Sequence, residues 1–90
     1  MIQRRVWVKG RVQGVGFRMA TLKAAQRYSD LRGYVKNLSD GQVEAVFAGA
    51  DEDVLLMTAW CKTGPSSARI DELKIREEGF DSKLTKFEVR

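Results

Sequence analysis

The chain has 90 residues, enough to bury one small hydrophobic core but too few for two separate ones, so we expect a single domain spanning residues 1–90. Its composition, 43% apolar and 31% charged with one proline, excludes a disordered or repetitive chain. The formal net charge of +4 favours anionic ligands in general, but the basic residues are spread along the chain and form no polybasic tail.

The residue types that the chain lacks also narrow its chemistry. A single cysteine, Cys61, excludes an internal disulfide, and the sequence shows neither a signal-peptide run nor the roughly 18 consecutive apolar residues of a membrane span. We therefore expect a soluble, cytoplasmic protein that does not engage a membrane. With no histidine, the chain lacks the usual acid and base at neutral pH and the commonest metal ligand.

The first half of the chain predicts a strand, a helix and a hairpin. Apolar and polar residues alternate from Ile2 to Val12, which indicates a half-buried strand. Apolar residues then recur at spacings of three and four, which predicts a helix from Phe17 to about Ser29. Two further extended segments, Leu31 to Leu38 and Val43 to Phe47, flank Asp40-Gly41, a dipeptide typical of a type I′ hairpin turn.

The second half predicts another helix and two more strands. Three acidic residues, from Asp51 to Asp53, favour a helix start, and Gly64-Pro65 ends that helix. Its expected inward stripe consists of Val54, Met57, Trp60 and Cys61, the cysteine as a small buried residue. Ala68 to Arg76 and Leu84 to Arg90 have extended character, and the apolar phase slips after Ile70, which indicates a β-bulge.

Four large apolar residues fall outside the expected core stripes of the two helices. They are Met19, Leu22, Leu55 and Leu56. Either the buried stripes are wider than the spacing indicates, or these residues form a weak self-association surface.

The order of strand, helix, strand, strand, helix and strand, with a final short strand, predicts an α+β fold of the ferredoxin-like, split βαβ type. In this fold two helices cover one face of a mostly antiparallel sheet of four to five strands. The first and second strands run parallel and end at the same edge of the sheet. We therefore expect the turn after Val12 to lie next to Asn37, at the end of the second strand.

The clearest chemical signal is the segment Gln13-Gly14-Val15-Gly16-Phe17-Arg18, where a strand gives way to a helix. Two glycines permit positive φ, successive amides can form an anion-binding nest, and a helix start adds free N–H groups and a positive dipole end. The fork of Arg18 can add two charged hydrogen bonds, and the carboxamide of Asn37 can orient a water molecule. The segment therefore predicts a cradle for a phosphate-sized anion.

Similar loops of other enzymes do not fit this segment. A Walker loop would need a lysine followed by serine or threonine, the dinucleotide pattern would need glycine where Met19 stands, and a cysteine phosphatase would have its nucleophile where Gln13 stands. The residues alone leave another interpretation open. The turn could serve only tight packing, with Arg18 in solvent, and Asn37 could simply cap a strand end.

Two long stretches resemble the two signatures of the acylphosphatases. They are Gly10-Arg11-Val12-Gln13-Gly14-Val15-Gly16-Phe17-Arg18, and Gly33-Tyr34-Val35-Lys36-Asn37 followed by Asp40-Gly41-Gln42-Val43-Glu44. Gly64-Pro65-Ser66-Ser67-Ala68 and the terminal Phe87-Glu88-Val89-Arg90 are similar to that family as well, so the resemblance covers essentially the whole chain. One departure is visible: the segment between Arg18 and Asn37 is one residue longer, with Ser29-Asp30 where the family commonly has a glycine.

The resemblance implies a small metal-independent hydrolase without a cofactor, which cleaves acyl phosphates into a carboxylate and inorganic phosphate. In the family's pattern the arginine, here Arg18, binds the phosphate, and the asparagine, here Asn37, orients the attacking water. The backbone amides from Gln13 to Phe17 would complete a phosphate site that also takes inorganic phosphate or sulfate. The expected partner is a small acyl phosphate rather than a nucleic acid, and the expected state is a monomer.

Two rival functions are compatible with the same order of elements. RNA-recognition domains share it and the chain is basic, but their aromatic run on the sheet face has no counterpart here. A noncatalytic module would hold an anion or carbamoyl phosphate in the same cradle without turnover. The pair Arg18 and Asn37 argues for catalysis.

Overall fold

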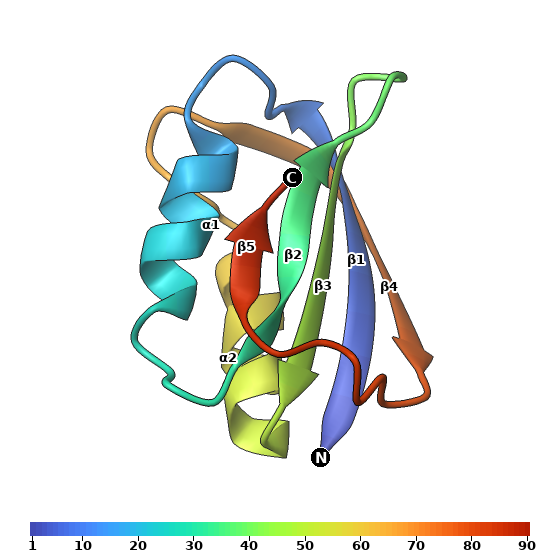
Figure 1. Cartoon of the computed structure of the whole chain (residues 1–90). Coiled ribbons are helices and arrows are strands. Elements are labelled where there is room, and N and C mark those ends of the chain that lie inside the picture. The colour runs from blue at the N-terminus through green and yellow to red at the C-terminus, as the bar shows by residue number, and fades with distance from the viewer.

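The computed structural model describes all 90 residues as five strands and two helices (Figure 1). In chain order these are β1 (Ile2–Arg11), α1 (Phe17–Ala25), β2 (Arg32–Asn37), β3 (Val43–Gly49), α2 (Asp51–Trp60), β4 (Arg69–Glu78) and β5 (Phe87–Val89). The strands form one sheet in the order β4-β1-β3-β2-β5. Neighbouring strands are antiparallel except β2 and β5, which are parallel. The predicted α+β, ferredoxin-like fold is confirmed, with five strands.

Strands β1 and β2 end at the same edge of the sheet. Both are antiparallel to β3, which lies between them, so they run in the same direction. The turn that follows β1 and the hairpin that follows β2 therefore meet at the upper end of the molecule in Figure 1. This confirms the predicted neighbourhood of the glycine turn and Asn37.

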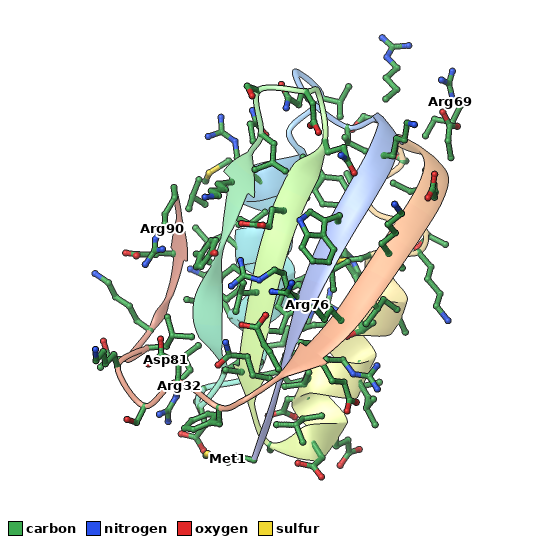
Figure 2. The ribbon with its side chains drawn as sticks, turned by 90° about the vertical axis from the view of Figure 1, so that its right-hand side faces the viewer. Met1, Arg32, Arg69, Arg76, Asp81 and Arg90 are labelled. Atoms are coloured by element: carbon green, nitrogen blue, oxygen red, sulfur yellow. The ribbon has the colours of Figure 1, made fainter.

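The hydrophobic core lies between the sheet and the two helices, which cover the same face of the sheet (Figure 2). Its buried members are Val6, Val8, Val12, Phe17, Ala24, Ala25, Leu31, Val35, Val43, Ala45, Phe47, Val54, Met57 and Cys61. The ring of Phe47 stacks on that of Phe87 at a centroid distance of 5.6 Å, which attaches the short strand β5 to this core.

The opposite face of the sheet carries a polar network instead of a layer of helices. Glu44 on β3, 8% exposed, accepts hydrogen bonds from the indole of Trp7 at 3.0 Å and from the hydroxyl of Tyr34 at 3.2 Å. Arg5 donates to the Tyr34 oxygen at 2.7 Å and to both carboxylate oxygens of Glu78, at 2.9 and 3.2 Å. The network satisfies the charges that this face buries.

Helix α1 is shorter than predicted and ends at Ala25 rather than near Ser29. After Ala25 the chain forms turns of the 3₁₀ type. The N–H groups of Tyr28 and Leu31 each donate to the carbonyl oxygen three residues earlier, both at 3.0 Å. The apolar spacing misleads here because Tyr28 still packs against the core from such a turn. Ser29-Asp30 make the connection without a left-handed residue, since only glycines in this chain have positive φ.

The β2–β3 hairpin does not use the predicted type I′ turn. That turn needs positive φ at both central residues, whereas Gly41 has φ 93° and Asp40 does not have positive φ. Instead, the Gly41 N–H donates to the carbonyl oxygen of Leu38 at 3.3 Å, and the Asp40 carboxylate accepts from the Gln42 N–H at 3.0 Å. The side-chain cap on Gln42 replaces the second left-handed residue.

The predicted bulge in β4 is confirmed. Lys9 of β1 pairs with Glu72, and the next residue, Gly10, pairs with Ile70. Asp71 is thus the extra residue on β4, which accounts for the slip in its apolar phase.

The core stripe of α2 differs from the prediction at one position. Val54, Met57 and Cys61 are buried as predicted, but Trp60 is only half-buried and Thr58 fills the remaining buried position. The Thr58 hydroxyl donates to the carbonyl oxygen of Val54 at 2.7 Å, which satisfies it inside the core.

The four large apolar residues outside the expected stripes of the two helices do not widen the buried faces of those helices. Met19, Leu55 and Leu56 are 62%, 46% and 47% exposed, and Leu22 is half-buried.

Neither helix has the length and apolar character that crossing a membrane requires.

Candidate active site

The turn between β1 and α1 reverses on two left-handed glycines, Gly14 with φ 75° and Gly16 with φ 79°. A Cβ at either position would meet no atom within 4 Å, so glycine is favoured here by the backbone conformation and not by crowding. None of the backbone hydrogen bonds outside helices and strands uses the N–H groups of Gly14, Val15 or Gly16. These N–H groups are therefore free to bind an anion.

The turn leads into the amino end of α1, which carries the positive end of the helix dipole. Gly16 is the N-cap, it provides no side-chain cap, and the first turn of α1 holds no acidic residue. Helix α2, by contrast, has Asp51, Glu52 and Asp53 in its first turn. The chain places its own carboxylates at the start of α2 and none in the first turn of α1, where an anion could therefore interact favourably with the helix dipole.

Contacts from the last residue of α2 and from the segment after it hold the turn in place. Phe17 is 1% exposed, and its ring lies 5.6 Å from that of Trp60. The hydroxyl of Ser67 donates to the carbonyl oxygen of Val15 at 2.7 Å. Gly64 allows this close approach, because a Cβ there would lie 2.7 Å from the Phe17 ring.

Arg18 lies in the first turn of α1 and is oriented by the residue that follows β5. Its Nη1 donates to the carbonyl oxygen of Arg90 at 3.1 Å. Arg90 is itself fixed to β2: its N–H donates to the carbonyl oxygen of Val35 at 2.8 Å, and its guanidinium lies 4.1 Å from the ring centre of Tyr34. The Nε and Nη2 groups of Arg18 have no partner within the protein and remain available for an oxyanion.

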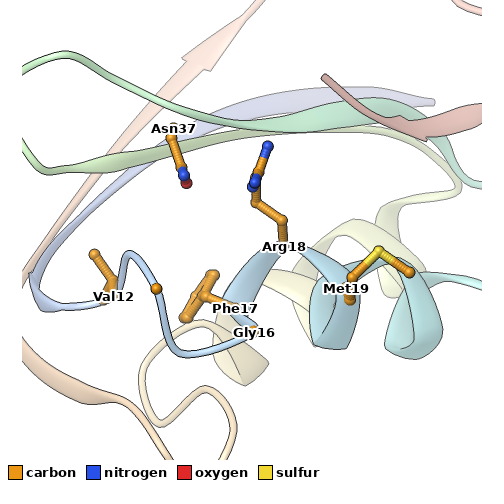
Figure 3. A pocket seen from close by; sticks show the side chains of 7 residues that line it. Val12, Gly16, Phe17, Arg18, Met19 and Asn37 are labelled. Atoms are coloured by element: carbon orange, nitrogen blue, oxygen red, sulfur yellow. The ribbon is translucent and has the colours of Figure 1, made fainter.

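Asn37 is the last residue of β2, and its side chain points into the space between the hairpin and the turn (Figure 3). It is exposed, and its carboxamide makes no hydrogen bond within the protein. The position of Asn37 relative to the turn is set by Gln13, whose Nε2 donates to the carbonyl oxygens of Leu38 at 2.7 Å and Gln42 at 2.9 Å. One side chain thus connects the two segments that form the site.

Together these elements line a cavity of about 110 Å³ (Figure 3). Its lining consists of Val12, Gly14, Gly16, Phe17, Arg18, Met19 and Asn37. Arg18 is the one charged residue in this lining, which contains no hydroxyl, thiol or carboxylate side chain. The cavity can bind an anion beside a carboxamide, but it offers no side chain for covalent catalysis.

Most of the site residues predicted from the sequence lie together. Gly14, Gly16, Phe17, Arg18 and Asn37 all line the cavity. The two others, Gln13 and Val15, are not among the lining residues: Gln13 holds the hairpin, and Val15 accepts the hydrogen bond from Ser67.

Three contributors went unassigned from the sequence. Arg90 orients Arg18, Ser67 holds the turn, and Met19 lines the cavity. Met19 carries a usable signal, since a large apolar residue outside the core stripe, directly after Arg18, indicates a surface role. Arg90 and Ser67 act through backbone groups distant in sequence, and no local pattern marks them.

Comparison with known proteins identifies the relatives of the chain. The acylphosphatase family model matches residues 4–89. An acylphosphatase of Gloeobacter violaceus is 47% identical over 88 residues, which cover 98% of this chain and 92% of that protein. An acylphosphatase of Syntrophobacter fumaroxidans is 44% identical over 84 residues, covering 93% and 86%.

Solved structures agree with these sequence matches. The acylphosphatase of Bacillus subtilis superposes with a TM-score of 0.92 at 31% identity, covering 100% of this chain and 99% of that one. The acylphosphatase of Coxiella burnetii gives 0.90 at 36% identity, covering 99% and 92%. The chain is also similar to 12% of full-length HypF, solved in its phosphate- and nucleotide-bound form, with a TM-score of 0.81 at 33% identity.

Proposed function

The chain belongs to the acylphosphatase family, and we propose that it hydrolyses acyl phosphates by direct attack of water on the phosphorus. The observation that supports this mechanism is the convergence of Arg18, Asn37 and the free N–H groups of the turn on one cavity whose lining holds no nucleophilic side chain. A phosphate held there has to react with a nucleophile from solvent.

The phosphoryl group is bound by charge and by oriented donors. Its oxygens accept hydrogen bonds from the N–H groups of the turn and from the free Nε and Nη2 of Arg18, while Nη1 stays on Arg90. Phosphoryl transfer depends mainly on positioning and on stabilising charge at these oxygens. We propose that Arg18 and the amides supply this stabilisation without a metal ion.

The attacking water is oriented by Asn37, whose carboxamide has both a donor and an acceptor free. The water oxygen bonds to phosphorus as the bond from phosphorus to the acyl oxygen breaks, and the acyl group leaves as a carboxylate. That leaving group is stable without protonation, so no general acid is needed, and the proton of the water passes to a phosphate oxygen or to solvent. This chemistry suits a chain without histidine.

The outer face of the sheet makes nucleic-acid binding the weaker proposal. Its aromatic residues, Trp7 and Tyr34, both donate to the carboxylate of Glu44. A carboxylate at the centre of the sheet opposes a phosphate backbone, and RNA-recognition domains instead present free aromatic faces there. That residues 1–90 form one monomeric domain in the cytoplasm stays a prediction.

Release of inorganic phosphate from acetyl phosphate tests the proposal. The wild-type chain is assayed with and without EDTA, beside Asn37→Ala and the control Ser39→Ala, an exposed residue of the same hairpin outside the cavity. We expect Asn37→Ala to lower kcat by about 10²-fold or more, by analogy with loss of one oriented donor in other enzymes. Its urea midpoint should not change, because the Asn37 side chain is exposed and makes no hydrogen bond within the protein.

Three outcomes would contradict the proposal in different ways. Phosphate binding without release from acetyl phosphate would indicate the noncatalytic module. Loss of turnover in EDTA would overturn metal independence alone. Full activity in Asn37→Ala would remove the role assigned to its carboxamide.

A further inference from the structure

A second hollow lies beside the cavity, on the exposed face of α1. This hollow measures about 440 Å³ and is lined by Met19, Ala20, Leu22, Lys23 and Gln26. Met19 lines both spaces, so they are neighbours on either side of this residue. Met19 follows Arg18 directly, and Figure 3 shows it on the side of Arg18 away from the turn.

This face of α1 exposes two large apolar side chains to solvent. Met19 is 62% exposed and Leu22 is half-buried, and neither belongs to the core cluster or to the residues packed against it. They lie three residues apart on α1 and therefore share one face of the helix. Apolar surface that is contiguous with a polar cavity is typical of a site whose ligand has a charged end and an apolar end.

We propose that this hollow, formed by Met19 and Leu22 beside the cavity, binds the acyl group of the substrate and makes the enzyme prefer acyl phosphates with a large apolar or aromatic acyl group. This inference rests on the proposed function. The phosphoryl group fills the cavity of about 110 Å³, and the acyl group extends past Met19 over the helix. The flexible thioether of Met19 can adapt to acyl groups of different shape.

Competition between acyl phosphates tests the inference. The value of kcat/KM is measured for acetyl phosphate, butanoyl phosphate and benzoyl phosphate with the wild type, Met19→Ser, Leu22→Ser and the control Leu55→Ser. Leu55 is 46% exposed, but it lies on α2 and lines neither space. Because the control removes the same kind of exposed apolar group, it accounts for general effects of surface polarity.

In the wild type, kcat/KM should rise from acetyl to butanoyl to benzoyl phosphate. Met19→Ser should lower the ratio of benzoyl to acetyl kcat/KM by about 4- to 15-fold, as expected from the loss of one or two methylene contacts. Leu22→Ser should act in the same direction, and Leu55→Ser should leave the ratio within about twofold of wild type, a difference too small for one lost methylene contact. The inhibition constant of inorganic phosphate should stay the same in Leu22→Ser, because phosphate alone occupies only the cavity.

Two results would overturn the inference. One is a ratio in Met19→Ser equal to that of Leu55→Ser. The other is a wild-type chain that sediments as a dimer and becomes monomeric in Met19→Ser with its ratio unchanged, since the face would then be a contact between two copies. If the wild type released no phosphate from any of the three substrates, the proposed function itself would fail. Met19 is largely exposed, so its variant should fold even if Leu22→Ser does not.

Discussion

Replacing Arg18 with lysine keeps the positive charge of the site and removes only the geometry of its donors. In the structure the guanidinium divides its donors: Nη1 is held by the carbonyl oxygen of Arg90 at 3.1 Å, and Nε and Nη2 face no protein acceptor. A lysine has a single nitrogen at the end of a flexible chain. It can donate to Arg90 or approach the phosphate, but it cannot present two parallel donors while it is anchored.

The structure also sets the size of the effect. The lysine variant loses at least one of the two charge-assisted hydrogen bonds that Arg18 can make to a phosphoryl group. Such a bond contributes about 1.5–3 kcal/mol, which corresponds to a loss of about 10- to 150-fold in kcat/KM. If the paired contact strengthens as charge develops on the equatorial oxygens, the loss should appear mainly in kcat rather than in KM.

The assay is release of phosphate from benzoyl phosphate by Arg18→Lys, with Arg27→Lys as the control, since Arg27 is exposed and its side chain makes no hydrogen bond or ion pair. Urea unfolding accompanies both variants, and we expect unchanged midpoints because Arg18 makes only one, exposed, hydrogen bond within the protein. A value of kcat/KM in Arg18→Lys within about threefold of wild type would refute the reasoning, because a lost charge-assisted bond costs more than that. Arg18 would then act only as a point charge.

Three further predictions concern stability and reactivity. Gly33→Ala should lower the free energy of unfolding by about 3 kcal/mol or more, because Gly33 has φ 139° and a Cβ there would overlap the backbone oxygen of Val46; an ordinary urea midpoint would contradict this. The Arg5 guanidinium holds the pKa of the Glu78 carboxyl below its usual 4.5, so this carboxylate stabilises the fold above about pH 4.5 and its contribution is lost as the pH falls through the lower folded pKa. Urea unfolding between about pH 3 and 7 should therefore show a shallower loss of stability in Glu78→Gln than in the wild type, and parallel curves would count against the ion pair. Burial raises the pKa of the Cys61 thiol to about 12, so thiol reagents should label it only as the chain unfolds, and rapid labelling of the native chain would show the assignment to be wrong.

The fold could be predicted from the sequence because its elements depend on local patterns. Alternation marks β1, and even the bulge at Asp71 is visible as a slip in apolar phase after Ile70. The errors arise where one pattern serves two structures. Tyr28 continues the helical spacing although it packs from a turn, and Asp40-Gly41 suits both a type I′ turn and the capped turn that is found.

In the candidate site, too, the residues that follow local patterns could be predicted and the others could not. Its glycines and Arg18 lie close together in the sequence, and the parallel direction of β1 and β2 predicts that Asn37 joins them. What the sequence could not indicate were hydrogen bonds to backbone oxygens across long separations: Arg18 and Arg90 are 72 positions apart in the sequence, and Ser67 and Val15 are 52 positions apart. A backbone acceptor has no residue signature, so only the folded chain reveals it.

Arg18, through Arg90, and Asn37 both depend on β2 for their positions. Asn37 ends that strand, and Arg90, which orients Arg18, is bonded to Val35 two residues earlier and stacks on Tyr34. The distance between the Arg18 guanidinium and the Asn37 carboxamide is therefore set by one short piece of strand. A shift of α1 against the sheet would move the backbone of Arg18, but the bond to Arg90 would tend to keep its guanidinium in register with Asn37. The strand, more than the helix that carries Arg18, sets the geometry on which the proposed attack by an oriented water depends.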